Sequence, residues 1–134
     1  MMKLFLISIL IFTSVITINK PQNDPLKDSI NRGEEIYTDF CMSCHLPNGE
    51  GVKKMFPPLA KSDYLIKNQE ASIRAIKFGI TGPITVNDIN YNNTMMPLGL
   101  SDKEIADVMN YINNSWGNEN KKIITAEAVS KVNK

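Results

Sequence analysis

Cys41-Met42-Ser43-Cys44-His45 is the stretch of sequence that decides the fold of this chain. It contains both cysteines and the single histidine of the 134 residues. Three residues of such rare types would almost never fall within five positions at random, so the cluster predicts one site that uses all three side chains. Pro47-Asn48-Gly49 follows directly and predicts the end of any helix that carries the motif.

The spacing of the cluster is typical of covalent haem attachment. In a helical turn, two thiols and an imidazole can surround one face of a macrocycle. The two cysteines then form thioether bonds, and the following histidine reaches the iron. We expect Cys41 and Cys44 to hold one haem c and neutral His45 to bind the iron through Nε2. The Nδ1–H of His45 would then be free for a second partner.

Three other interpretations of the cluster are weaker. A thioredoxin-like pair should follow a strand and open a helix, whereas this pair closes a predicted helix. A zinc site needs four ligands, and the cluster offers three that are too close together. A structural disulfide would leave the adjacent histidine unexplained.

The sixth iron ligand is predicted to be a methionine. Because the chain has no second histidine, bis-histidine ligation within one chain is excluded. Met95 and Met96 lie in a long segment rich in Gly, Pro, Asn and Thr, and a thioether ligand suits electron transfer. The competing interpretation is that both methionines only fill space in the core. Residue pattern alone does not choose between Met95 and Met96.

Apolar periodicity predicts an all-α chain with long loops. No alternation persists long enough to predict a sheet. Ser29 is expected to cap the helix that leads to the motif, and Ser101 with Glu104 forms a capping box. The expected elements are a helix that starts near 29, carries the motif at its end and stops before Pro47, then a turn from 62 to 66, a helix from 70 to 78, a loop from 80 to 97, a helix from 101 to 117 and a short helix within 125–132.

These motifs together resemble the class I, monohaem cytochrome c family over roughly residues 30–117. The resemblance rests on Gly33-Glu34-Glu35-Ile36-Tyr37, Cys41 to His45, Pro57-Pro58-Leu59 and Met96-Pro97 followed by Leu100-Ser101-Asp102. It implies helices and long loops packed around one covalently attached haem.

The resemblance also implies roles for single residues. The axial methionine of that family commonly stands before a proline, which selects Met96 over Met95. A carbonyl in the Pro-x-Leu segment accepts the histidine Nδ1–H, which matches Pro57, with Pro58 as the alternative. The glycine and an aromatic residue of the first helix pack on the last helix, so Gly33 and Tyr37 or Phe40 should meet Tyr111.

A narrower similarity concerns the segments 79–87, 91–92 and 114–118. They resemble cytochrome c subunits or domains of periplasmic oxidoreductases, such as copper nitrite reductases and quinoprotein dehydrogenases. The chain departs from the usual pattern at Leu46-Pro47 and at the doubled Met95-Met96.

The N-terminal segment predicts export. A positive start at Met1-Met2-Lys3 precedes an apolar run from Leu4 to Ile18, which suits a signal peptide over residues 1–19. A retained membrane anchor is the alternative, and the absence of a nearby cysteine excludes a lipoprotein anchor. The expected divisions are then a linker at 20–28, a cytochrome domain at 29–118 and a C-terminal extension at 119–134.

Charge and motif together predict an electron carrier rather than an enzyme. A net charge of +1 gives no case for nucleic-acid binding. Redox partner proteins of the periplasm are the expected partners, and membrane contact is expected only if the N-terminal segment is retained.

Tyr91 and Trp116 are expected either beside the haem or in the core. The alternative function is a haem protein with an open sixth site, such as a gas sensor or a peroxidase-like enzyme. Basic residues that could steer an acidic partner, or be ordinary surface, are Lys53, Lys54, Lys61, Lys67, Arg74 and Lys77.

Overall fold

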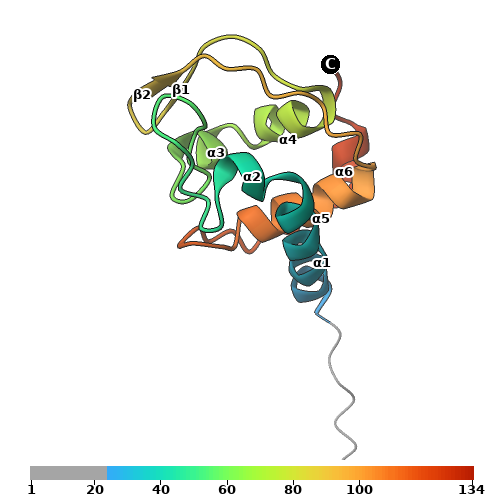
Figure 1. The fold of residues 1–134 in the computed structure, drawn as a ribbon. Helices are drawn as coiled ribbons and strands as arrows, with labels where there is room; N and C mark the ends of the chain where they lie inside the picture. The colour runs from blue at the N-terminus through green and yellow to red at the C-terminus, as the bar shows by residue number, and fades with distance from the viewer. Residues whose placement is uncertain (1–23) are drawn as a thin grey trace, which may run out of the picture.

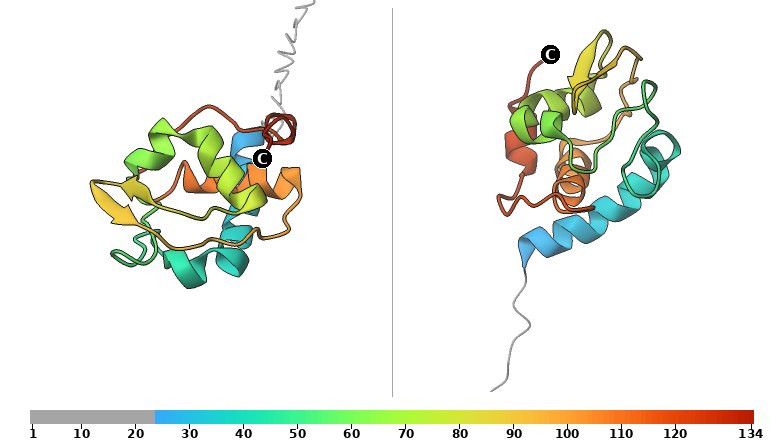
Figure 2. Two further views of the ribbon diagram at one scale, coloured as in Figure 1. Left: turned by 90° about the horizontal axis from the view of Figure 1, so that it is seen from above. Right: turned by 90° about the vertical axis from the view of Figure 1, so that its left-hand side faces the viewer.

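The structure, a computed structural model, describes residues 24–134, so the predicted signal peptide lies outside the described residues (Figure 1). In chain order the elements are α1 (Pro25–Phe40), α2 (Met42–His45), α3 (Asp63–Lys67), α4 (Gln69–Phe78), β1 (Ile84–Val86), β2 (Ile89–Tyr91), α5 (Asp102–Ile112) and α6 (Ala126–Ser130). α1 and α5 lie at one side of the molecule, and α3, α4 and the β1–β2 hairpin lie at the other (Figures 1 and 2). The described part of the chain has no helix of the length and apolarity that a bilayer crossing requires.

The first helix begins four residues before the predicted start. The Asp24 side chain accepts hydrogen bonds from the backbone N–H groups of Leu26 and Lys27, and Pro25 occupies the first turn. Aspartate at the cap and proline just inside it both favour a helix start. The prediction that Ser29 caps the helix, and that 25–28 is linker, is therefore wrong. Ser29 is buried within the helix instead.

α1 packs closely against α5. A Cβ on Gly33 would collide with the backbone carbonyl of Asp107 and lie 2.8 Å from Cβ of Tyr111. The rings of Tyr37 and Tyr111 are 5.4 Å apart between centroids. The predicted meeting of Gly33 and Tyr37 with Tyr111 is confirmed, whereas Phe40 is 46% exposed.

A buried carboxylate joins the same two helices. Asp107 of α5 accepts hydrogen bonds from Ser29 (2.6 Å) and Arg32 (2.7 Å) of α1, and from Lys103 (2.9 Å). Burial by itself raises the pKa of Asp107, but these donors outweigh that effect and lower it to about 2. The carboxylate is therefore charged and paired at neutral pH.

The 80–97 segment contains a hairpin, where the sequence predicted a loop without strands. β1 and β2 pair antiparallel, with Ile84 opposite Tyr91 and Val86 opposite Ile89. Asn87 and Asp88 both have positive φ, the backbone that a tight two-residue hairpin turn requires. Each strand has three residues, which is too short to give a readable alternation.

The remaining helices largely match their predictions. Ser62 caps α3, and both halves of the Ser101–Glu104 capping box are present. α5 ends at Ile112 rather than near Trp116, and residues 113–117 form turns instead of further helix. α6 lies within 125–132 as expected, and its Val129 belongs to the same buried core as α1, α4 and α5.

Candidate functional site

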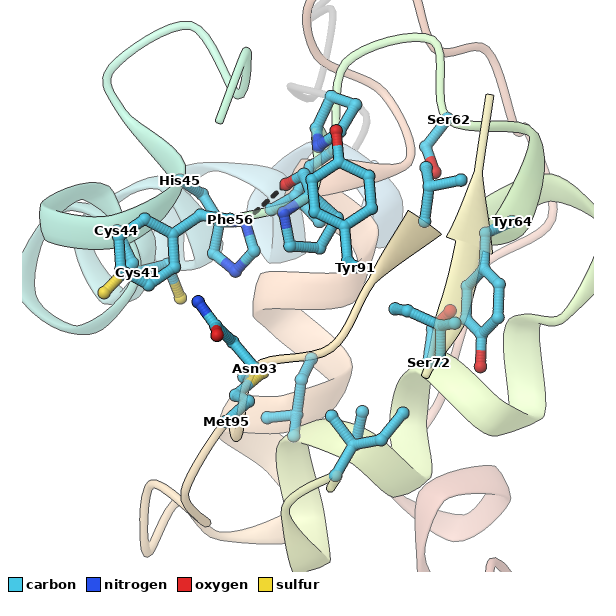
Figure 3. A pocket seen from close by; sticks show the side chains of 18 of the residues that line it. Cys41, Cys44, His45, Phe56, Ser62, Tyr64, Ser72, Tyr91, Asn93 and Met95 are labelled. Atoms are coloured by element: carbon cyan, nitrogen blue, oxygen red, sulfur yellow. Dashed lines mark hydrogen bonds between the residues drawn. The ribbon is translucent and has the colours of Figure 1, made fainter. Parts of the chain in front are cut away.

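A cavity of about 460 Å³ lies between α2, α4, the hairpin and α5. Its wall is mainly apolar, with Leu65, Ile76, Val86, Met109 and Ile112 among the lining residues. Cys41, Cys44, His45 and Met95 line the same cavity, so the predicted site residues from distant parts of the chain meet there (Figure 3).

The Cys41–His45 segment forms a single helical turn that enters the cavity wall. Cys41 is the C-cap of α1, directly after Phe40. The backbone N–H of His45 donates to the carbonyl of Cys41 at 2.9 Å. Leu46 stops the turn with a positive φ, and the Tyr37 hydroxyl donates to the Leu46 carbonyl at 2.6 Å. No disulfide joins the two cysteines, of which Cys41 is buried and Cys44 is half-buried. Burial, and then the neighbouring Cys44, raise the pKa of the Cys41 thiol to about 11.

His45 is held in one orientation by a backbone carbonyl. Its Nδ1 lies 2.9 Å from the carbonyl oxygen of Pro57. Because a carbonyl only accepts, Nδ1 carries the proton and Nε2 keeps a free lone pair. Burial lowers the pKa of the imidazole, partly opposed by the Pro57 hydrogen bond, so the ring is neutral at physiological pH. The acceptor is therefore the carbonyl of Pro57, as predicted, and not that of Pro58.

The segment that carries Pro57 is fixed by contacts that the sequence did not reveal. The Gly49 carbonyl accepts from Leu59 at 2.7 Å and from Ala60 at 2.9 Å. The buried Asn118 side chain donates to the Leu59 carbonyl at 2.9 Å and accepts from the Lys61 N–H at 2.8 Å. A Cβ on Gly51 would collide with the Phe56 carbonyl, so only glycine fits there. Asn118 is far from this loop in sequence, and the resemblance of segment 114–118 gave it no role in holding the loop.

The two methionines have different surroundings. Met95 pairs with Ile80 through two backbone hydrogen bonds of 2.9 Å and packs against the buried core. Met96 is 68% exposed. Both methionines line the cavity, and of the two only Met95 packs against the buried core. The sixth ligand therefore stays a prediction, and the backbone pairing and core contact of Met95 support the alternative of the two.

The two aromatic residues left open by the sequence have different surroundings. Tyr91 is buried and lines the cavity. Trp116 packs against Tyr37 and Tyr111, with ring centroids 4.9 and 5.4 Å away, and covers Gly49. Trp116 is thus a core aromatic.

The basic residues of 53–77 do not form one free positive surface. Lys67, Arg74 and Lys77 pair with Asp63, Glu70 and Asp102 respectively. Lys53 and Lys54 are exposed and have no ion-pair partner within residues 24–134.

Comparison with known proteins identifies the family. The sequence profile described as "Cytochrome c" matches residues 30–116, well over half of the chain. The chain belongs to the cytochrome c family. Its mainly helical structure with long loops and one small hairpin agrees with the class I cytochrome c fold.

Several relatives show how this cytochrome compares. Cytochrome c-552 of Thermus thermophilus is 38% identical over 109 residues, covering 75% of this chain and 82% of the relative. The cytochrome c subunit of the quinone alcohol dehydrogenase of Gluconobacter oxydans (strain 621H) is 34% identical over 106 residues, covering 76% of this chain and 22% of the relative. Cytochrome c6 of Alaria esculenta is 32% identical over 85 residues, covering 62% of this chain and 87% of the relative.

Family membership confirms the expected cofactor and the class of function. The cytochrome binds haem c with its iron covalently and transfers electrons, and it is not an enzyme by itself. Cytochrome c subunits of quinone alcohol dehydrogenase and gluconate 2-dehydrogenase are among its relatives. The cavity fits the group, because apolar walls suit a porphyrin and two thiols with a free imidazole nitrogen border the same space.

Proposed function

We propose that this cytochrome carries single electrons on one haem c held by Cys41 and Cys44, with His45 and Met95 as the axial ligands. The observation that supports it most is the fixed His45 ring in the same cavity as the inward-facing Met95. Haem c supplies one-electron chemistry by alternating between ferrous and ferric iron.

The protein's own contribution is to keep both sides of the site unchanged during transfer. The Pro57 carbonyl fixes the His45 ring and its tautomer. The backbone pairing of Met95 with Ile80 fixes the opposite side. The apolar wall excludes water, so few groups need to move when the charge of the site changes.

Paired alanine substitutions test the assignment of the sixth ligand. In Met95→Ala we expect the ferric protein to lose the weak red absorption band of thioether ligation and the ferrous protein to bind carbon monoxide. Met96→Ala, the matched control, should keep the band and exclude carbon monoxide, because Met96 borders the cavity but is 68% exposed and does not pack against the buried core. The opposite pattern in optical spectra of the two variants would make Met96 the ligand.

We also propose that partners approach over the loop that carries Lys53 and Lys54. Met55, the next residue, lines the cavity, so positive charge here lies close to the site. Such charge steers an acidic partner toward the site and raises the rate of encounter. The other basic residues contribute less, because three of them are already paired.

Export to the periplasm is the proposed location, with residues 1–19 as the signal peptide. The apolar run from Leu4 to Ile18 supports it. N-terminal sequencing of haem-containing protein from the periplasmic fraction tests the proposal. A mature chain that begins near residue 20 is expected, whereas an intact N-terminus in the membrane fraction would indicate a retained anchor.

A further inference from the structure

The segment that carries Met95 is held at two points on different sides of the cavity. One is the backbone pairing of Met95 with Ile80, just beyond α4. The other is a hydrogen bond in which Asn93 Nδ2 donates to the backbone carbonyl of Met55 at 2.9 Å. Asn93 itself lines the cavity, as do Met95 and His45 (Figure 3).

The acceptor of the Asn93 bond belongs to a tightly closed loop. Val52 and Phe56 exchange two backbone hydrogen bonds of 2.8 Å, and the Met55 N–H donates to the Val52 carbonyl at 2.8 Å. The Met55 carbonyl is therefore a fixed acceptor. It also lies two residues before Pro57, whose carbonyl orients His45.

The Asn93 bond thus connects the two walls that carry the proposed axial ligands. We propose that Asn93 is a positioning residue, which keeps Met95 opposite His45 and sets how often the sixth position opens. This inference rests on the proposed function, because it requires Met95 to be the ligand. Without the bond, the Met95 segment would keep the Ile80 pairing and the hairpin but lose its direct link to the Met55 loop, so the thioether would leave a bound iron more often.

Displacement of the ligand by imidazole measures that opening directly. Imidazole binds ferric iron only after Met95 leaves, so at saturating imidazole the observed rate equals the rate of opening. For Asn93→Ala we expect this rate to rise about three- to tenfold, the effect of one lost hydrogen bond of ordinary strength. Asn93→Asp should open at least as fast, because a carboxylate has no N–H to donate and repels the Met55 carbonyl.

Asn92→Ala is the matched control. Asn92 is exposed, and its side chain makes no hydrogen bond within the part of the chain that the structure describes. Its rate should equal that of the unaltered protein. Equal rates for Asn93→Ala and Asn92→Ala would overturn the inference, and Asn93→Asp gives the same decision if the alanine variant does not retain haem.

The kinetics of the unaltered protein separate the two levels of proposal. If the rate saturates with imidazole but is unchanged in the Asn93 variants, the positioning role of Asn93 is rejected and the assignment of Met95 as ligand stands. A rate that rises linearly with imidazole, in a protein without the thioether band, means that the sixth position is open and overturns the ligand assignment as well.

Discussion

At the scale of single residues, the strongest long-range polar contact is the one that Asp107 makes with α1. The side chain is 5% exposed and is surrounded by Ser29, Arg32 and Lys103. Its pKa of about 2 in the folded protein lies below the ordinary value of 3.8. The folded state therefore gains stability from the charged form above pH 3.8 and loses it as the pH falls toward 2.

Asp107→Asn should lower the free energy of unfolding by about 2 kcal/mol at pH 7, from a pKa difference of nearly two units. The difference from the unaltered protein should shrink below pH 4 and disappear near pH 2, as chemical denaturation at several pH values would measure. Glu127→Gln, which breaks an exposed pair with Lys131, is the control and should change little. A loss for Asp107→Asn that did not depend on pH would contradict the role of charge.

Residue-scale prediction from sequence succeeded where chemistry is local. All three predicted haem-binding residues of the motif lie within the five positions from Cys41 to His45. Ser101 and Glu104, which form the capping box, are one helical turn apart. Sequence-based prediction was wrong for the cap at Ser29, because the competing local signal of Asp24 followed by Pro25 decides the helix start. The buried hydrogen bond of Ser29 to Asp107 could not be predicted, because the two residues are 78 positions apart. Asn93 and Asn118 were missed for the same reason: asparagine is common in loops, and only the folded structure brings their acceptors close.

At the scale of elements, the segment from α4 to α5 decides which of the two methionines packs against the buried core. The Ile80–Met95 pairing sets the register, and the hairpin between them brings the two residues together. Sequence could not predict this choice, because a shift of one residue exchanges Met95 and Met96 without changing composition. The proline after Met96 favours Met96 by resemblance, whereas the backbone pairing of Met95 with Ile80 supports the other member of the pair.

Gly79 is the element-scale position where this register is most sensitive. It has a φ of +78°, and a Cβ there would lie 2.7 Å from the Met95 carbonyl and 3.0 Å from Cδ of Pro97. Gly79→Ala should therefore destabilise the protein by about 2 kcal/mol through overpacking, beyond the cost of backbone strain. It should also speed imidazole binding.

Gly99→Ala is the control for backbone strain, since Gly99 has a φ of +72° and a Cβ added there would have no neighbouring atom within 4 Å. Thermal unfolding of both variants would measure the difference. Equal losses of stability would mean that contact with the Met95 segment is unimportant.

At the scale of the whole molecule, charge determines how partners approach. Electrostatic steering should be concentrated at Lys53 and Lys54, because Lys67 and Arg74 are each paired with an acidic residue one helical turn away. The overall charge of +1 is too small to orient a partner by itself. A local charge beside the cavity is the effective one.

The double variant Lys53→Glu, Lys54→Glu should slow oxidation of the ferrous protein by anionic ferricyanide severalfold at low ionic strength. It should speed oxidation by a cationic cobalt(III) complex. Stopped-flow rates should converge as salt screens the charges. Lys67→Glu, the control, should have a smaller effect, and equal effects of Lys67→Glu and the double variant would reject the local surface.

The packing of α1 on α5 has a consequence for the order of events during biogenesis. Cys41 belongs to the same buried cluster as Met109 and Ile112 of α5, so the folded chain shields its thiol. A chain that crosses a membrane from its N-terminus exposes Cys41 and Cys44 well before α5 follows. On the proposed export route, the Cys41 thioether bond is therefore expected to form before α5 packs on α1, and the packed helices then shield that bond.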